Sequence, residues 1–168
     1  MAPGALSHRP VQADDLPLIC SFPQSAEELF FLAPRARHPL DAEQLSAAIA
    51  QRFDSTVALL DGRVSAFANF YVRERGGTCA IGNVVVDPSA RGRGVGGYLV
   101  EAMARAALRV HGASLVKISC FHANVAGLLL YTKLGFEPYA IEQRKGPDGG
   151  KVALIHMRLG EQASSRLR

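Results

Sequence analysis

The seven residues from Arg91 to Gly97, RGRGVGG, combine two arginines with four glycines. Glycine reaches backbone angles closed to other residues and leaves no Cβ between main-chain amides and a ligand. The apolar spacing that follows predicts a helix over 95–110, so the turn lies where unpaired N–H groups and the helix dipole favour an anion. Arginine adds charge-assisted donors. The predicted phosphate-binding residues are Arg91, Gly92, Arg93, Gly94, Val95, Gly96 and Gly97.

Three other interpretations of this turn are weaker. The letters from Gly92 to Gly97 match the GxGxxG pattern of dinucleotide-binding folds, but five residues separate the preceding strand from the first glycine. The next predicted strand, 114–121, also ends without the acidic residue that would hold a ribose hydroxyl. A P-loop is excluded because the glycines are not followed by the sequence GK[ST]. A merely solvated turn needs one or two glycines, and each costs about 0.5–1 kcal/mol.

A second motif, NVAGLLLYTKLGF from Asn124 to Phe136, follows the turn. Together with VVVDPSARGRGVGGYL it resembles the two acetyl-CoA-binding motifs of the GNAT acetyltransferases. In that family Arg or Gln, two residues, Gly, one residue and Gly or Ala contact the pyrophosphate, and Arg91, Gly94 and Gly96 match these positions. The resemblance implies the family's fold over residues 5–160 and acetyl-CoA as the donor, with no metal.

The resemblance also implies roles on the donor side. The backbone N–H groups of Val84, Val85 and Val86 would face the pantetheine arm and the acetyl oxygen, where loss of one such donor typically costs about 2.7–4 kcal/mol. Tyr131 matches the family's general acid toward the coenzyme A sulfur, and a phenol with a pKa of about 10 suits that task. The alternative explanations are structural: the three valines would belong to a β-branched core strand, and Tyr131 would be a core tyrosine.

Two further residues of the second motif are expected to help bind the donor. Asn124 would bond the pantetheine arm, although an ordinary helix N-cap also explains it. Gly127 lowers helix propensity by about 1 kcal/mol, and its lack of a side chain would let the cofactor approach the helix closely.

The general base is the catalytic group for which the sequence gives the weakest signal. A lysine-like amine is neutral in only about one molecule in 2,500 at pH 7, a handicap of about 4.6 kcal/mol. Relatives place a glutamate on one of two strands, at the positions that Ala80 and Ser119 occupy here. Ser119 is therefore predicted to take part in catalysis by anchoring a water chain that removes the proton. His122 is a second candidate for removing the proton, and the alternative is that this histidine has a structural role.

The acceptor wall is expected in the segment SAEELFFLAPRARHP, which resembles that of bacterial GNAT enzymes acting on small amines or lysine-bearing peptides. Glu27 or Glu28 could attract a cationic amine, and Phe30 or Phe31 could line its aliphatic stem. Glu28 and Phe31 are the predicted substrate-binding residues. A capping box with Ser25 is the alternative explanation for Glu28. The alternative for the phenylalanines is that they are core residues.

Periodicity and turn residues predict a mixed α/β fold: a central, mostly antiparallel sheet with flanking helices. Strands are expected over 6–12, 56–60, 64–72, 78–87, 114–121, 136–143 and 151–159. Helices are expected over 13–22, 25–32, 40–53, 95–110 and 124–135. One domain over 5–160 and a frayed tail over 161–168 follow, and a homodimer is left open.

Composition and charge limit the kinds of partner and the cellular compartment that are expected for the chain. The chain of 168 residues carries a net charge of +4, mostly from scattered arginines, which suits an anionic small molecule better than nucleic acid. No apolar run is long enough to span a bilayer, and the first fifteen residues lack a secretory-signal pattern. The three cysteines form no CxxC pair, which favours a reducing compartment and a cytoplasmic protein.

The leading functional hypothesis is an N-acetyltransferase that moves the acetyl group of acetyl-CoA to a primary, lysine-like amine of a small molecule or peptide. The amine would attack directly within a ternary complex. One alternative is a protein N-terminal acetyltransferase of the ribosomal-protein type, which has a cleft open at both ends. The other is a non-catalytic acyl-CoA-binding module, and the presence of Tyr131 disfavours it.

Overall fold

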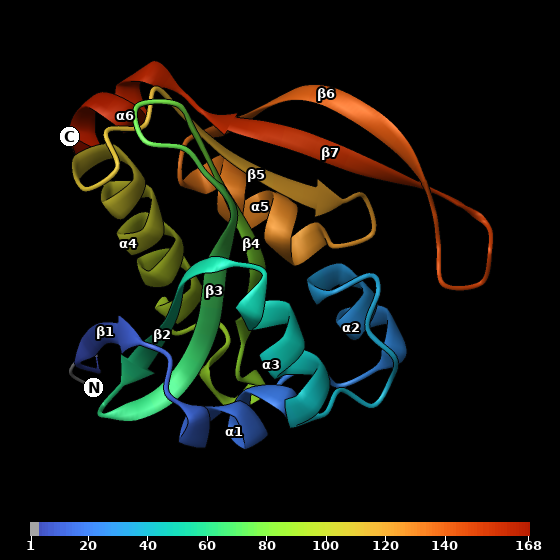
Figure 1. Ribbon diagram of the computed structural model, residues 1–168. Coiled ribbons are helices and arrows are strands. Elements are labelled where there is room, and N and C mark those ends of the chain that lie inside the picture. Colours follow the sequence, from blue (N-terminus) through green and yellow to red (C-terminus); the bar gives the residue numbers. More distant parts are fainter. Residues whose placement is uncertain (1–3) are drawn as a thin grey trace.

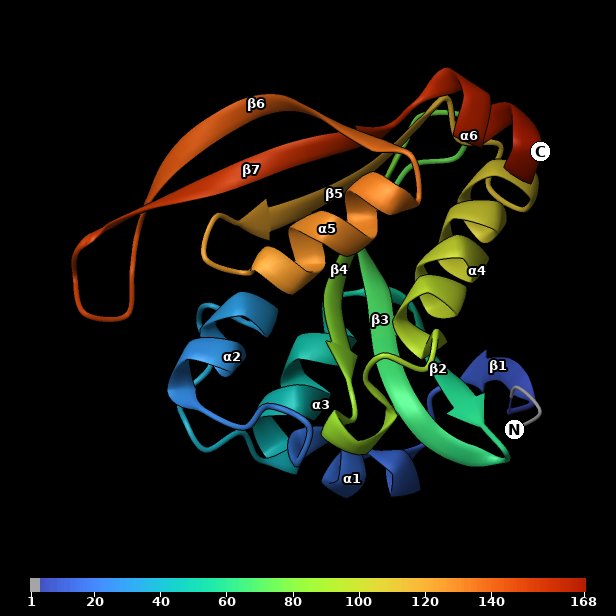
Figure 2. The same ribbon diagram turned by 180° about the vertical axis from the view of Figure 1, so that it is seen from behind.

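A computed structural model describes residues 4–168 as a seven-stranded sheet with helices on both faces (Figures 1 and 2). The strands are β1 (Leu6–Pro10), β2 (Phe53–Leu60), β3 (Arg63–Arg73), β4 (Thr78–Val86), β5 (Leu115–Phe121), β6 (Phe136–Lys145) and β7 (Lys151–Leu159). The helices are η1 (Ala13–Asp15), α1 (Leu16–Cys20), α2 (Ala26–Leu32), α3 (Ala42–Ala50), η2 (Pro88–Ala90), α4 (Val95–Arg109), α5 (Val125–Lys133) and α6 (Glu161–Leu167). The predicted mixed α/β fold is confirmed.

The spatial order of the strands is β1-β2-β3-β4-β5-β7-β6. Every neighbouring pair is antiparallel except β4 and β5, which are parallel and connected through α4. Because side chains alternate along a strand, the sheet supplies two separate cores. One lies under α1, α2 and α3, and the other under α4 and α5. The two figures show α4 and the α1–α3 group on opposite sides of β2–β4.

Local signals in the sequence account for where the helices begin. Asp41 caps α3 by accepting a hydrogen bond from the Gln44 N–H at 2.9 Å. Asn124 caps α5 in the same way, with the Gly127 N–H as the donor at 3.1 Å. Gly94, in the left-handed conformation with φ 84°, is the N-cap of α4. These predicted helix starts are confirmed.

The sheet opens between its two parallel strands. Pairing of β4 with β5 ends at Ile81 and Ile118, although β4 continues to Val86. Directly after this point Asn83 adopts a positive φ of 51° within a register shift against β3. Its amide donates to the Leu32 carbonyl at 2.7 Å, which ties the irregular part of β4 to the end of α2. On the side of β5, residues 82–86 have no strand partner among those the structure describes.

The chain ends in a long hairpin and a short helix. β6 pairs with β7 alone, and the hairpin projects beyond the rest of the molecule (Figure 1). The expectation of a frayed tail over 161–168 is wrong, because residues Glu161–Leu167 form α6. Leu167 is buried against the α4 side of the core, and Arg166 forms an ion pair with Glu101 at 3.1 Å. Burial of this leucine holds the tail in place.

Candidate active site

The turn before α4 has the features of an anion cradle. Gly92 and Gly94 have φ angles of 76° and 84°, which other residues rarely adopt. No heavy atom lies within 4 Å of the place where a Cβ would stand on either glycine. No side chain caps α4, and the amides of its first turn, from Val95 to Gly97, have no hydrogen-bond acceptor among the described residues. The turn therefore fits a pyrophosphate group held by backbone N–H groups and the dipole of α4.

The two arginines of the turn have different surroundings. Arg93 is exposed, and its guanidinium lies 3.7 Å from the Asp61 carboxylate. The Arg91 guanidinium is instead held by α2: Nη1 and Nη2 donate to the two Glu28 carboxylate oxygens at 3.0 and 2.9 Å. It also donates to the backbone carbonyls of Phe22 and Val86, each at 3.4 Å. The sequence predicts Arg91 as a phosphate ligand, but here its side chain connects the turn to α2.

Two predicted donor-side glycines have packing reasons for lacking a side chain. A Cβ on Gly96 would stand 3.1 Å from the Val86 side chain and 3.4 Å from Leu130, so this glycine brings α4 close to β4 and α5. A Cβ on Gly127 would stand 2.7 Å from the Asn124 side chain and 3.0 Å from the Cys120 sulfur. Gly127 therefore makes room for the N-cap of its own helix, a reason different from the one predicted.

The three valines before the turn alternate between the two cores. Val84 and Val86 pack against the core under α4 and α5, and Val85 is buried in the core under α1–α3. Their side chains thus hold β4 in the sheet. Because β5 has already diverged, the backbone on that side of the strand has no sheet neighbour among the described residues. Because strand N–H groups alternate and that of Asp87 donates to the Ser65 carbonyl on β3, the N–H groups of Val84 and Val86 face the opening and that of Val85 faces β3.

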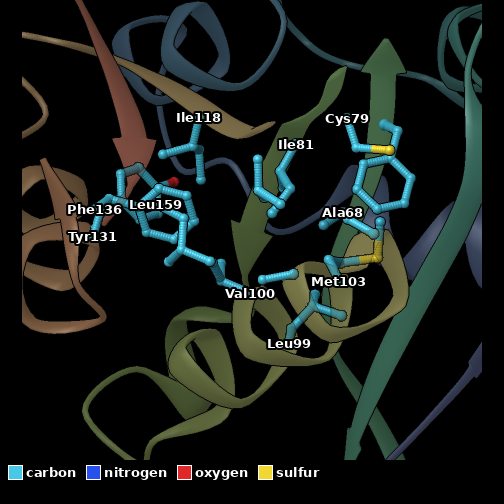
Figure 3. Close-up of a cluster of buried hydrophobic side chains, with 14 of the residues drawn as sticks. Ala68, Cys79, Ile81, Leu99, Val100, Met103, Ile118, Tyr131, Phe136 and Leu159 are labelled. Atoms are coloured by element: carbon cyan, nitrogen blue, oxygen red, sulfur yellow. The ribbon is translucent and has the colours of Figure 1, made fainter. Parts of the chain in front are cut away.

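Tyr131 lies on α5 in an apolar environment, with 5% of its surface exposed. Figure 3 shows its ring beside Phe136 and Leu159, and the ring packs edge-on against Phe136 at 6.3 Å between centroids. Burial, with a smaller contribution from nearby Cys120, raises the pKa of the phenol above its ordinary value. Among the described residues its hydroxyl has no hydrogen-bond partner. The group is therefore protonated at neutral pH and available to donate.

Ser119 belongs to a polar network that the sequence did not indicate. Its Oγ lies 2.8 Å from His156 Nδ1 on β7 and 3.4 Å from the Tyr71 hydroxyl on β3. His156 Nε2 lies 2.9 Å from Glu142 on β6. The signal that could have found this network is the pairing register of the closing hairpin with β5. That register depends on tertiary structure and is not visible in a local pattern.

A shallow pocket of about 70 Å³ lies between α2, the β5–α5 link and the hairpin. Its lining consists of an aromatic set, one carboxylate and hairpin residues: Glu27, Phe30, Phe31, Phe121, His122, Ala123, Pro147 and Val152. The Phe30 and Phe121 rings are 4.5 Å apart between centroids. Predicted Phe31 is thus in the pocket. Predicted Glu28 is not, because its carboxylate is paired with Arg91, and Glu27 lines the pocket in its place.

His122, the second candidate base, has a structural contact. Its Nδ1 accepts a hydrogen bond from the Ala153 N–H at 3.1 Å. This bond joins the end of β5 to β7 and holds the hairpin beside the pocket. In this arrangement one ring nitrogen is occupied, and the other remains at the pocket wall.

Comparisons with known proteins agree with this geometry. The model of the acetyltransferase (GNAT) family matches residues 21–136, so the chain belongs to that family. It is an acetyl-CoA-dependent acetyltransferase, as predicted. Between residues 4 and 168, no cluster of three His, Cys, Asp or Glu side chains is arranged to hold a metal ion. None of the helices described there is both long and apolar enough to cross a membrane.

Solved structures share the fold at low sequence identity. YncA from Salmonella typhimurium, solved with its cofactor acetyl-CoA, superposes with a TM-score of 0.69 at 23% identity, over 92% of this chain and 93% of that one. The ribosomal-protein-alanine N-acetyltransferase from Brucella melitensis gives 0.72 at 22% identity, over 90% and 98%. A spermidine N-acetyltransferase SpeG chimera from Vibrio cholerae and hSSAT gives 0.75 at 13%, over 96% and 97%. These likenesses concern the fold alone.

Proposed function

We propose that this enzyme acetylates a primary, lysine-like amine of a small molecule or peptide side chain. The amine attacks acetyl-CoA directly while both are bound. The observation that carries the proposal is the position of Tyr131, a buried and protonated phenol without a hydrogen-bond partner among the described residues. It lies on the helix that follows the opened strands, as the acid for a departing thiolate must.

The donor side is expected to work through backbone groups. Amides between Gly92 and Gly97 hold the pyrophosphate at the N-terminus of α4. Backbone N–H groups alternate along a strand, and that of Asp87 donates to the Ser65 carbonyl on β3, so those of Val84 and Val86 lie on the open side of β4 and that of Val85 faces β3. The Val84 and Val86 N–H groups are expected to stabilise the charge that develops on the acetyl oxygen. Asn124, at the N-cap of α5, lies at the other border of the opening and is expected to bond the pantetheine arm. Arg91 contributes by fixing the turn against α2.

The pocket supports a slender cationic acceptor. Phenyl faces and a nearby carboxylate attract an ammonium group, which here would contact Phe30, Phe31 and Glu27. An N-terminal acetyltransferase instead needs a cleft open at both ends. The pocket of about 70 Å³ is lined by residues of α2 and by Pro147 and Val152 of the hairpin, and its small volume favours a small amine or a side chain over a protein N-terminus.

The cysteines support a reducing compartment such as the cytoplasm. Cys20, Cys79 and Cys120 are all free thiols in the structure. Burial raises the pKa of Cys120 to about 12, so this thiol is protonated and unreactive at neutral pH. Buried free thiols of this kind are typical of proteins that fold where disulfides do not form.

A panel of acceptors tests the proposal. Purified protein is mixed with acetyl-CoA and, separately, with spermidine, short diamines, N-terminally blocked lysine peptides and peptides with a free N-terminal alanine. Release of free thiol is measured against a blank without acceptor. We expect turnover with diamines, spermidine or blocked lysine peptides. Turnover with free N-terminal alanine alone would establish the alternative, and no turnover above the blank would refute the proposal.

A further inference from the structure

Ser119, His156 and Glu142 form a hydrogen-bonded row across three neighbouring strands. Ser119 on β5 is directly opposite His156 on β7, and Ser119 Oγ lies 2.8 Å from His156 Nδ1. The other ring nitrogen, Nε2, lies 2.9 Å from the Glu142 carboxylate on β6. Both distances are those of well-formed hydrogen bonds. When the neutral ring carries its proton on Nε2, Ser119 donates to Nδ1 and Nε2–H donates to Glu142.

The inner end of this row lies where the sheet opens. Ile81 and Ile118 form the last pair between the parallel strands, so Gly82 and Ser119 are the first residues beyond it. A Cβ on Gly82 would stand 2.8 Å from the Tyr71 ring, so this glycine lets the ring cross β4. The Tyr71 hydroxyl then reaches to 3.4 Å from Ser119. The row thus runs from the opening of the sheet to the exposed hairpin.

Tyr131 and Ser119 approach the opening from opposite faces of the sheet. Ile118 and Cys120, on either side of Ser119, belong to the core that also contains Tyr131. Because side chains alternate along a strand, Ser119 points to the other face. A proton donor for the departing sulfur and a proton acceptor for the amine are therefore placed on two sides of one gap.

We propose that Ser119, His156 and Glu142 form the proton-acceptor relay of this enzyme, an inference that rests on the proposed acetyl transfer. The bound ammonium group passes one proton to Ser119 Oγ while the Ser119 proton moves to His156 Nδ1 and from there to solvent. The neutral amine nitrogen then bonds to the acetyl carbon and releases its second proton by the same route. The C–S bond breaks with its electron pair on sulfur, which takes the Tyr131 proton. Solvent then removes the proton from His156 and restores that of Tyr131. Ser119 contacts the amine, and Glu142 is a positioning residue.

The charges around His156 suit this role. The hydrogen bond from His156, and then that from Arg144, lower the pKa of Glu142, which is therefore ionised at neutral pH. Its negative charge stabilises an imidazolium next to it. Other titratable groups nearby are Tyr139, whose ring lies 6.2 Å from the imidazole, Lys117, whose ammonium lies 5.5 Å from the Tyr139 ring, and Tyr71, whose hydroxyl lies 3.4 Å from Ser119 Oγ. The Glu142 carboxylate thus separates His156 from the cation of Arg144.

Kinetics of His156→Gln with acetyl-CoA and the best acceptor of the panel test the relay. At about pH 7, kcat/KM falls about 10²-fold, the lower end of general-base effects, with KM for acetyl-CoA unchanged. The deficit shrinks toward about pH 9.5, because solvent then supplies more neutral amine. Ser119→Ala and Glu142→Gln, which disturb the sheet less, lose about tenfold with the same trend, since water or an amide partly replaces each group.

His111→Gln is the matched control. His111, in the link between α4 and β5, forms the same kind of pair with a carboxylate: its Nε2 lies 2.6 Å from Asp54. This variant keeps wild-type kinetics. Wild-type kcat/KM at about pH 7 in folded His156→Gln, or in both Ser119→Ala and Glu142→Gln, would overturn the relay. A deficit that stays constant with pH would do so too, because it would indicate structural support alone.

A second readout needs no acceptor and so separates failure of the relay from failure of the proposed function. Long-range ¹H–¹⁵N spectra of ¹⁵N-histidine-labelled protein report the tautomer of each imidazole. In spectra recorded at a pH where the His156 ring is neutral, we expect its proton on Nε2, and a displaced Nδ1 or Nε2 resonance in Ser119→Ala and Glu142→Gln respectively. His156 resonances that neither substitution moves would overturn the relay, even if the panel reveals an active enzyme.

Discussion

The proposed donor and acceptor sides of the site are built in different ways. The part of the donor side that faces the phosphates and the acetyl group is a short continuous stretch, since β4, the glycine turn and the first residues of α4 follow one another along the chain, and α5 adds Asn124 and Tyr131. The acceptor side is assembled from α2, the β5–α5 link and the β6–β7 hairpin, which are far apart in sequence. Ser119 and His156 are separated by 37 positions, and Glu28 and Arg91 by 63.

This difference predicts how each side responds to substitution. On the donor side a few backbone groups share one anion, so a single residue that blocks the turn removes the binding site. On the acceptor side, several weaker contacts from separate elements share the task, so one substitution changes rate or affinity by a smaller factor.

The largest effect is expected from Gly94→Asp. The new side chain enters the open space before α4, adds a negative charge where phosphate belongs and strains a backbone with φ 84°. Loss of two charge-assisted hydrogen bonds, about 1.5–3 kcal/mol each, adds to the charge repulsion and the strain, so we expect calorimetry to detect no coenzyme A binding and the reaction to be abolished. Gly112→Asp, at a φ of 61° and likewise in open space, carries similar strain and should bind normally. Wild-type affinity of Gly94→Asp would contradict the cradle.

Tyr131→Phe is expected to have the next largest effect. Without its acid, kcat falls about 10²–10⁴-fold, while acetyl-CoA affinity changes little. Because the hydroxyl has no hydrogen-bond partner among the described residues, its removal leaves the melting temperature near that of the wild type. Stopped-flow detection of thiol release, with calorimetry on the same protein, measures both. Unaltered turnover would remove Tyr131 from the acid role.

Glu28→Gln tests the contact between the two sides and should have the smallest effect. Arg91 lowers the pKa of Glu28 through their hydrogen bonds, so the pair stabilises the fold above the ordinary glutamate pKa and is lost as pH falls through the lowered value. Since both side chains are partly exposed, the loss is at most about 1 kcal/mol, or about 2–4 °C in Tm. Thermal melts of both proteins should differ at neutral pH and converge in acid. Equal Tm values at neutral pH would contradict a stabilising pair.

Much of the fold and of the donor side could be predicted, because their signals are local. Asp41 and Asn124 mark helix starts by bonding N–H groups within the next three residues, and the glycine turn carries its chemistry in consecutive letters. The tail was missed because its helix depends on the burial of Leu167 against another element. A single leucine near the end of a chain gives no pattern that indicates this contact.

The acceptor side could be predicted only in part. The aromatic pair in α2 is visible as composition, and Phe31 does line the pocket. Which of the two neighbouring glutamates faces it depends on Arg91, a distant residue. His156 and Glu142 become relevant only through strand register, because β7 inserts between β5 and β6. No local sequence pattern indicates a row of polar residues that crosses three strands.

The projecting hairpin has a consequence for how such an enzyme can change its choice of amine. From Glu137 to Lys145 every residue of β6 is exposed, and this edge strand is joined to the sheet through β7 alone. Its tip helps to line the acceptor pocket but lies far along the chain from the glycine turn. We therefore expect that segment 144–151 can be replaced by that of a relative without disturbing the rest of the fold. The machinery for holding and activating the acetyl donor then remains as it was.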